Sequence, residues 1–294
     1  MPELPEVETL RRSLLPHLLG RRIRRVALAR RDVVRGLPRG ATRARTALLE
    51  GQRVAEIRRH GKQLALIGDG GGCVCVHLGM SGSLCVVSAG RRRAETASKH
   101  VHVRWRLDDG RCLRFRDPRR FGGLWVFEDL PRLQEKRWDG LGPDALSITP
   151  GALHARLNQT RRALKAALLD QNLVAGLGNI YADEVLYAVR LHPLAPSNGL
   201  DPAGCRRVVR AIRRILSRAL DNGGSTLRDY VDASGRPGGF QTRFKAYGRI
   251  GQPCARCGQL LEGLVVAGRT TSVCPRCQQS VNTTSEERIK PSSP

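Results

Sequence analysis

Aromatic residues and long apolar runs are both scarce in this chain of 294 residues. Phe, Trp and Tyr make up 4% of the sequence, too few for a surface that binds single-stranded nucleic acid by stacking bases on aromatic rings. No run approaches the ~18 consecutive apolar residues of a membrane span, and the opening MPELPEVE is acidic where a signal peptide is basic. We therefore expect an intracellular protein with no membrane partner.

Acidic residues are also in short supply. The chain has 26 Asp and Glu against 51 Lys and Arg, which gives a formal net charge of +25. Such an excess favours a polyanionic partner, and nucleic acid comes first because neutralising phosphates releases condensed counterions. The chain is long enough for two domains, each with its own core.

The cysteines are odd in number, at nine, and show little pattern, so a disulfide framework is not expected. The exceptions are two C-x2-C pairs near the C-terminus, separated by 16 residues: Cys254, Cys257, Cys274 and Cys277. This spacing is typical of a tetrahedral four-thiolate zinc site. With all four positions filled by sulfur, the predicted Zn²⁺ is structural and has no open position for catalysis.

The N-terminal part reads as a helix followed by short strands. Apolar residues from Leu4 recur at helical spacing, and turn signals such as Gly68-Asp69-Gly70 separate the later segments. The predicted strands are Gln63–Ile67, Cys73–Leu78, Ser83–Val87, Val101–Leu107, Cys112–Phe115 and Leu124–Phe127. We expect an α+β protein whose N-terminal domain, residues 1–134, is an antiparallel β-sandwich with flanking helices.

The C-terminal part is expected to be helical. Residues 135–150 read as a linker, and the periodicity after them predicts helices over Ala152–Asp170, Asn179–Arg190 and Pro202–Leu220. We assign residues 151–250 to a helical domain, 251–279 to a zinc finger built on a β-hairpin, and 280–294 to a disordered tail.

Pro2 is a candidate reactive group. An α-amine has a pKa near ~7.7 to 8.0, so removal of Met1 would expose a secondary amine that is partly neutral and nucleophilic at physiological pH. Glu3 and Glu6 lie close enough along the first helical turns to move protons for it. From these residues alone, however, Pro2 and Glu3 also fit an ordinary helix start.

Five segments in order resemble the bacterial formamidopyrimidine-DNA glycosylases, which share their fold with the endonuclease VIII-like enzymes. They are Met1-Pro2-Glu3-Leu4-Pro5-Glu6-Val7, His77-Leu78-Gly79-Met80-Ser81-Gly82, Asp117-Pro118-Arg119-Arg120-Phe121-Gly122, Gly176-Leu177-Gly178-Asn179-Ile180-Tyr181-Ala182, and the cysteine cluster with Gly268-Arg269-Thr270. The resemblance extends to about Gln279 and implies that the helical domain carries a helix-two-turns-helix motif.

The resemblance also implies a role for each matching residue. Pro2 would be the nucleophile, Glu3 the acid that opens the sugar ring with help from Glu6, and Lys62 a phosphate contact near the lesion. The residues that fill the gap left by the rotated nucleotide would be Met80, Arg119 and Phe121. The remaining implied DNA contacts are Asn179 and Arg269 on backbone phosphates and Lys165 near the active site.

The implied activity is excision of oxidised purines, 8-oxoguanine and formamidopyrimidines, from double-stranded DNA, followed by strand cleavage through β,δ-elimination. Leu4 and the loop Gly235-Arg236-Pro237-Gly238-Gly239 favour the purine branch of the fold. An oxidised-pyrimidine glycosylase of the same fold and a noncatalytic zinc-ribbon protein that binds damaged DNA remain as alternatives. We expect a monomer in the bacterial cytoplasm, associated with the nucleoid through DNA.

Overall fold

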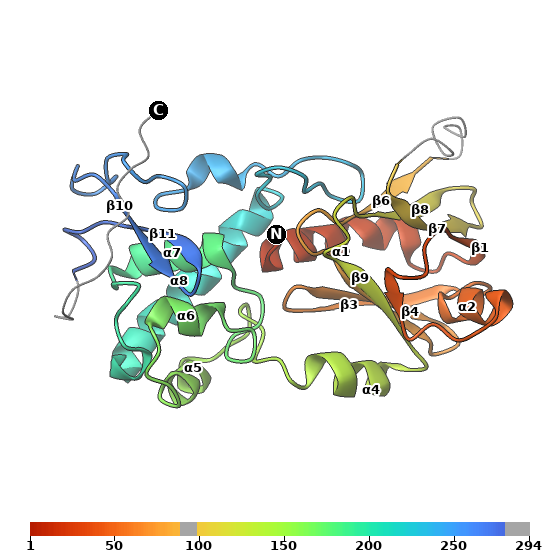
Figure 1. The fold of residues 1–294 in the computed structure, drawn as a ribbon, viewed down its shortest axis with the longest axis horizontal. Helices are drawn as coiled ribbons and strands as arrows, with labels where there is room; N and C mark the ends of the chain where they lie inside the picture. Colours follow the sequence, from red (N-terminus) through yellow and green to blue (C-terminus); the bar gives the residue numbers. More distant parts are fainter. Residues whose placement is uncertain (89–98, 280–294) are drawn as a thin grey trace. The chain divides into compact units, whose positions relative to one another are not determined.

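The computed structural model describes residues 1–88 and 99–279 (Figure 1). It divides into two compact units, and the chain passes between them more than once. Unit 1 comprises Met1–Gly140 and Leu220–Gln241, and unit 2 comprises Leu141–Ala219 and the described residues of Thr242–Pro294. The predicted tail over 280–294 lies outside the described residues.

Unit 1 is a β-sandwich with helices, as the sequence predicts. One sheet has the order β1-β7-β8-β6 and the other the order β2-β9-β5-β4-β3, and all pairings are antiparallel except that of β2 with β9. The strands are β1 (Ile23–Leu28), β2 (Val34–Arg35), β3 (Val54–His60), β4 (Gln63–Gly68), β5 (Cys73–His77), β6 (Ser83–Val87), β7 (Val101–Leu107), β8 (Cys112–Arg116) and β9 (Gly123–Phe127). The helices of its first segment are α1 (Leu4–Leu18), α2 (Ala41–Ala47), α4 (Leu130–Leu133) and the π-helical turn η1 (Gln134–Trp138).

A single core joins α1 to both sheets. Leu10 and Leu14 of α1 belong to the same buried cluster as Phe115 of the four-stranded sheet and Leu66 and Val76 of the five-stranded sheet. Burial of these apolar faces, at roughly 25 cal/mol per Å², is the main force that holds the sandwich together. It also fixes the start of α1, where the first candidate residues lie.

Unit 2 is helical and ends in a β-hairpin. Its helices are α5 (Pro150–Leu157), α6 (Leu164–Leu169), α7 (Asn179–Val189), the 3-10 turn η2 (Ser197–Gly199), α8 (Pro202–Asp221), whose last two residues belong to unit 1, and the 3-10 turn η3 (Phe240–Arg243), which begins in unit 1. The hairpin pairs β10 (Glu262–Val266) with β11 (Arg269–Val273). Thr149 caps α5 by accepting the Ala152 N–H at 3.2 Å.

The structure differs from the sequence predictions in three places. The helix expected over Ala152–Asp170 is wrong as a single element, because it breaks between α5 and α6 in the polar stretch that follows Leu157. The linker expected over 135–150 begins later, since η1 continues to Trp138, which is 8% exposed. The sequence places residues 220–241 in the helical domain, but they cluster with unit 1.

The reason for this last difference is hydrogen bonding to α1 and β6. The Ala233 N–H donates to the Ser13 hydroxyl at 3.0 Å, and the Val86 N–H donates to the Ala233 carbonyl at 2.8 Å. Ala233 is fully buried in the sandwich core. The segment is therefore a part of unit 1 that is remote in sequence.

Candidate active site

The N-terminus of α1 holds two buried carboxylates. Glu3 is 3% exposed and Glu6 1% exposed, and the Glu3 N–H donates to the Glu6 carboxylate at 2.8 Å. This bond satisfies one of the amides that a helix start leaves without an intrahelical partner. Pro2 is buried beside them, whereas Met1 is 51% exposed. The structure thus brings the three predicted N-terminal residues together.

The segment 220–241 completes this site. The Ser225 N–H donates to the other oxygen of the Glu6 carboxylate at 2.8 Å, and the Tyr230 hydroxyl donates to the Glu6 carbonyl at 3.0 Å. Burial, together with the charge of Glu6, raises the pKa of Tyr230 far above its ordinary value, so the phenol stays protonated and continues to donate. The Glu3 and Ser225 amides thus orient the Glu6 carboxylate, and Tyr230 holds the Glu6 backbone.

Gly224 permits that close approach. Its φ is +79°, and a Cβ built on it would lie 3.1 Å from the Glu6 side chain. A side chain at this position would force Glu6 to shift by a few tenths of an ångström, and the positive φ itself favours glycine. Sequence reasoning missed Ser225 and Tyr230, which lie more than two hundred residues from Glu6 and match no motif considered there.

Lys62 lies in the turn between β3 and β4 and is 7% exposed. It lies near His77, whose pKa is lowered to about 4 first by burial and then by the positive charges of Arg137 and Lys62. The Gly79 N–H donates to His77 Nδ1 at 3.3 Å, which places the proton of the neutral ring on Nε2. His77 is therefore an uncharged hydrogen-bond donor beside a cationic group.

Arg137 was not predicted from the sequence. It extends from η1 over the outer face of the five-stranded sheet, with its guanidinium carbon 4.0 Å from the centre of the Trp125 ring and its Nε donating to Gln63 at 3.2 Å. Gln63 is the register partner of His77, so Arg137 and His77 share one face of the sheet. π-helical turns occur often at functional sites, but this one could not be recognised before the structure was known.

Two loops present the residues expected to fill the duplex. Met80 is 45% exposed and Phe121 56% exposed, so both loops present a large apolar side chain at the surface. The Arg119 guanidinium carbon lies 4.5 Å from the centre of the Phe121 ring. The structure thus brings the three predicted residues together in unit 1.

The fully buried Asp117 ties the two loops to each other. Its carboxylate accepts the Ser81 hydroxyl at 2.6 Å and the Gly122 N–H at 2.8 Å. Gly79 has a φ of +61°, and a Cβ there would lie 2.3 Å from the Gly122 nitrogen, so the backbones meet with no room for a side chain. The exposed tips are held on a rigid base.

In unit 2, the start of α7 lies against the hairpin. The Asn179 side-chain amide donates to the Thr270 carbonyl at 2.9 Å, and Arg269, next in the chain, is exposed. Asn179 is the first residue of α7, where amide N–H groups and the helix dipole favour an anion. Both predicted phosphate contacts therefore belong to one local arrangement.

Lys165 has a different environment. It is 0% exposed, and its Nζ lies 2.6 Å from the Asp183 carboxylate and donates to the Thr271 hydroxyl at 2.7 Å. An ammonium enclosed in this way has no surface left for a phosphate. Its geometry is that of a structural ion pair that joins α6, α7 and β11.

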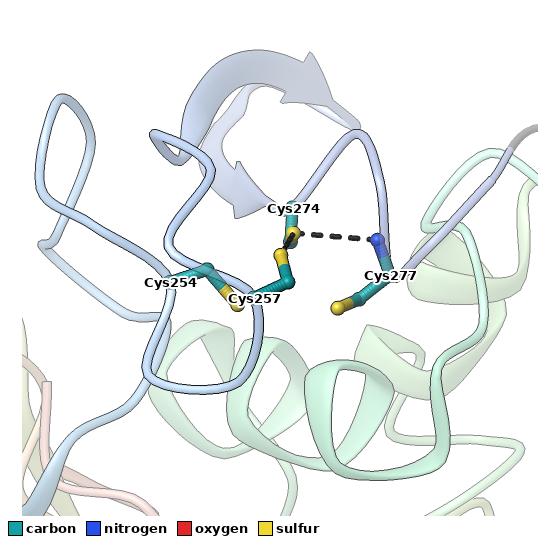
Figure 2. A group of neighbouring side chains, drawn as sticks. All are labelled: Cys254, Cys257, Cys274 and Cys277. Atoms are coloured by element: carbon teal, nitrogen blue, oxygen red, sulfur yellow. Dashed lines mark hydrogen bonds between the residues drawn. The ribbon is translucent and has the colours of Figure 1, made fainter.

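The four predicted zinc ligands converge (Figure 2). The sulfurs of Cys254, Cys257, Cys274 and Cys277 all lie within 4.8 Å of one another. The Cys277 N–H donates to Cys274 Sγ at 3.3 Å, and the Arg256 N–H donates to Cys254 Sγ at 3.5 Å, as amides in such knuckles do for thiolates. The donor set and spacing fit a single tetrahedral Zn²⁺.

Three family models match in sequence order. They are the formamidopyrimidine-DNA glycosylase N-terminal domain over residues 1–124, the formamidopyrimidine-DNA glycosylase H2TH domain over 140–231, and the zinc finger found in FPG and IleRS over 251–279. The last match agrees with the cysteine geometry and confirms the prediction of one structural zinc.

Curated relatives and solved structures agree with these matches. The formamidopyrimidine-DNA glycosylase of Chloroflexus aurantiacus is 43% identical over 95% of this chain and 98% of its own, and that of Thermus thermophilus is 44% identical with the same coverage. The crystal structure of the MutM (Fpg) protein from Thermus thermophilus has a TM-score of 0.81 at 42% identity, covering 94% of this chain and 98% of that one. The Lactococcus lactis Fpg in complex with DNA containing an abasic site has a TM-score of 0.84 at 32% identity, covering 95% and 100%.

Fold, zinc finger and N-terminal site together define a DNA repair glycosylase of the kind built from a β-sandwich and a helix-two-turns-helix domain. The chain belongs to the formamidopyrimidine-DNA glycosylase family. The family and fold predictions from the sequence are confirmed. Across residues 1–88 and 99–279, no helix has the length and apolar character needed to cross a bilayer.

Proposed function

We propose that this chain removes oxidised purines from double-stranded DNA and then cleaves the strand at the resulting abasic site. The observation that supports this most is the enclosed N-terminus, where Pro2 lies with two buried carboxylates, Glu3 and Glu6, and Ser225 and Tyr230 donate to the Glu6 carboxylate and the Glu6 carbonyl respectively. Two nearly inaccessible acids in one helical turn are costly to bury and are a common mark of a catalytic site.

The proposed chemistry starts when Met1 is removed, because only then is the Pro2 nitrogen an amine rather than an amide. That amine attacks C1′ of the damaged nucleoside, the bond from C1′ to the base breaks, and the base leaves with a proton. Glu3 donates a proton to the sugar-ring oxygen, so the ring opens and a Schiff base to Pro2 forms. Loss of the 3′ and then the 5′ phosphate by β- and δ-elimination follows, and water releases Pro2.

The other proposed roles concern DNA. Lys62 holds a phosphate near the lesion, and Asn179 and Arg269 hold phosphates from unit 2. The exposed Met80, Arg119 and Phe121 occupy the space that the rotated nucleotide leaves. Lys165 is omitted from the proposed contacts because it is fully buried. We place the enzyme, as a monomer, on DNA in the bacterial cytoplasm.

Relatives named for their activity support the substrate class. Lactococcus lactis Fpg variants have been solved with Fapy-dG-containing DNA at 32% identity to this chain, which agrees with the purine preference inferred from Leu4 and the 235–239 loop. An oxidised-pyrimidine enzyme of the same fold is the second candidate. The buried pair Glu3 and Glu6 speaks against a noncatalytic binder.

Borohydride trapping on matched duplexes tests this proposal. We expect a covalent adduct with 8-oxoguanine DNA when Met1 has been removed, and no adduct when Met1 is retained. Glu3→Gln should slow ring opening, and so formation of the trapped adduct, by about a hundred- to ten-thousand-fold, the usual contribution of a general acid. Glu135→Gln, which removes an exposed carboxylate of unit 1, is the matched control and should react normally. An adduct formed with a blocked N-terminus would refute the role of Pro2, and faster reaction with an oxidised pyrimidine would select the second candidate.

A further inference from the structure

Helix α8 has one face made almost entirely of arginine. The exposed arginines are Arg206, Arg207, Arg210, Arg213, Arg214 and Arg218. At about 100° per residue they fall within a sector of about 140°, while the apolar residues of the helix are buried on the other side. We call these six residues the α8 arginine face.

This composition is not that of an ordinary solvated helix surface. Exposed faces usually alternate both signs of charge, but no Asp or Glu occurs between Pro202 and Leu220. Among the residues that the structure describes, Arg206, Arg207, Arg210 and Arg214 form no ion pair. Like charges three and four residues apart each cost a few tenths of a kcal/mol in a helix. The chain therefore carries an unfavourable arrangement that an external anion would relieve.

The geometry restricts which anion fits. The apolar side of α8 is used inside unit 2, where Val208, Ile212 and Leu216 are buried, so the helix has no free apolar side to insert into a lipid surface. From Arg206 to Arg218 the helix rises about 18 Å. A duplex presents a phosphate charge about every 1.7 Å of its axis, which matches a row of guanidiniums better than any single small anion does.

We propose that the α8 arginine face binds the phosphate backbone of undamaged duplex DNA, as a surface additional to Lys62, Asn179 and Arg269. Its contribution is sequence-independent affinity, which holds the enzyme on DNA before a lesion is reached. The inference rests on the proposed function only in taking duplex DNA as the polyanion. Its readout, binding to undamaged DNA, does not require Pro2 to react.

The test replaces four members of the face in the full-length, zinc-loaded protein: Arg206→Gln, Arg207→Gln, Arg210→Gln and Arg214→Gln. Glutamine is close to arginine in helix propensity, so α8 should remain folded. Binding to an undamaged duplex is measured against salt concentration. Loss of four phosphate contacts should make the negative slope of log K against log salt shallower by about 3.6. Between 50 and 200 mM salt, the wild type would then lose roughly a hundred-fold more affinity than the variant.

A second quadruple variant with the same net charge is the control. It carries Arg24→Gln, Arg25→Gln, Arg39→Gln and Arg43→Gln, four exposed positions of unit 1. We expect the control to keep the wild-type slope to within about one contact, and both variants to excise a lesion normally in a single turnover at saturating DNA. Equal slopes for the two variants would overturn the proposal. The proposal would also be overturned if the α8 variant lost affinity only for anionic vesicles or single-stranded RNA and kept the wild-type affinity for duplex DNA.

Discussion

Replacing Lys165 with methionine should destabilise unit 2 strongly while leaving phosphate contacts intact. Lys165 and Asp183 are 0% and 1% exposed, and their charged atoms are 2.6 Å apart. Removing one member of such a pair leaves the other charge buried without compensation, which typically costs about 3–5 kcal/mol. Asp183→Asn should cost a similar amount. The double variant should recover most of the loss, because a neutral pair of similar volume is often tolerated.

The pH dependence of folding stability gives an independent check of the Lys165–Asp183 pair. Burial raises the pKa of Asp183 to about 6 even with Lys165 opposing the shift. Without Lys165 the folded-state pKa rises further above the unfolded value, so the folded state binds the proton more tightly. The Lys165→Met variant should then lose roughly 1.4 kcal/mol per pH unit between pH 5 and 7, an effect absent from the double variant.

Urea unfolding of the zinc-loaded proteins measures these differences. Arg162→Met is the matched control, because Arg162 pairs with Asp170 at the surface with side chains 50% and 26% exposed. Its loss should stay below about 1 kcal/mol. The structural role is refuted if Lys165→Met unfolds like wild type and the slope of log K for DNA against log salt falls in magnitude by about 0.9. That result would mean that Lys165 contacts a phosphate.

Three further predictions concern unit 1 and the zinc finger. In urea unfolding, Gly79→Ala should cost about 3 kcal/mol of stability, because its φ is +61° and a Cβ would lie 2.3 Å from the Gly122 nitrogen. The control Gly20→Ala, at a φ of +74° with open space around it, should cost about 1 kcal/mol. Equal losses for the two variants would contradict the close contact at Gly79. Burial alone would raise the pKa of Glu8, but hydrogen bonds from three arginines lower it to about 2. The wild-type protein should therefore lose about 1–2 kcal/mol of folding stability from this group as the pH falls from 4.5 to 2. Glu8→Gln should not show this loss. Chelation of zinc should unfold the segment 251–279 and abolish tight DNA binding. Cys257→Ser should reproduce this effect, whereas Cys205→Ser, which lies outside the cluster, should leave DNA binding unchanged. Retention of tight binding by the chelated protein would refute the prediction.

Local patterns in the sequence were enough for many of the elements. The strands β5, β7 and β9 and the helix α7 were predicted within about two residues, because apolar periodicity and turn residues mark them clearly. β1 and β3 were not recognised. In each of them a pair of arginines interrupts the alternation of apolar and polar residues, and only pairing with β7 and β4 shows the buried face.

Contacts distant in sequence account for what remained hidden at the site. Motif resemblance pointed to Pro2, Glu3 and Met80, and spacing alone pointed to the cysteines, whereas Ser225 and Tyr230 reach Glu6 only through the folded position of segment 220–241. Burial is equally invisible in one sequence. Lys165 has the appearance of a DNA-binding cation in a basic chain, and only the structure reveals the Asp183 partner.

The return of residues 220–241 to unit 1 has a consequence for the order of events during synthesis. A nascent chain that has only reached Gly140 lacks the Ser225 and Tyr230 contacts that orient Glu6. At about 5–20 residues per second, the ribosome needs roughly 5–20 s more to supply them. By then most of the helical domain has also been made. A chain that ends before Ser225 would therefore keep the Glu3 contact to Glu6 but lack the contacts from segment 220–241, so the proposed site is completed only after most of the helical domain has been made.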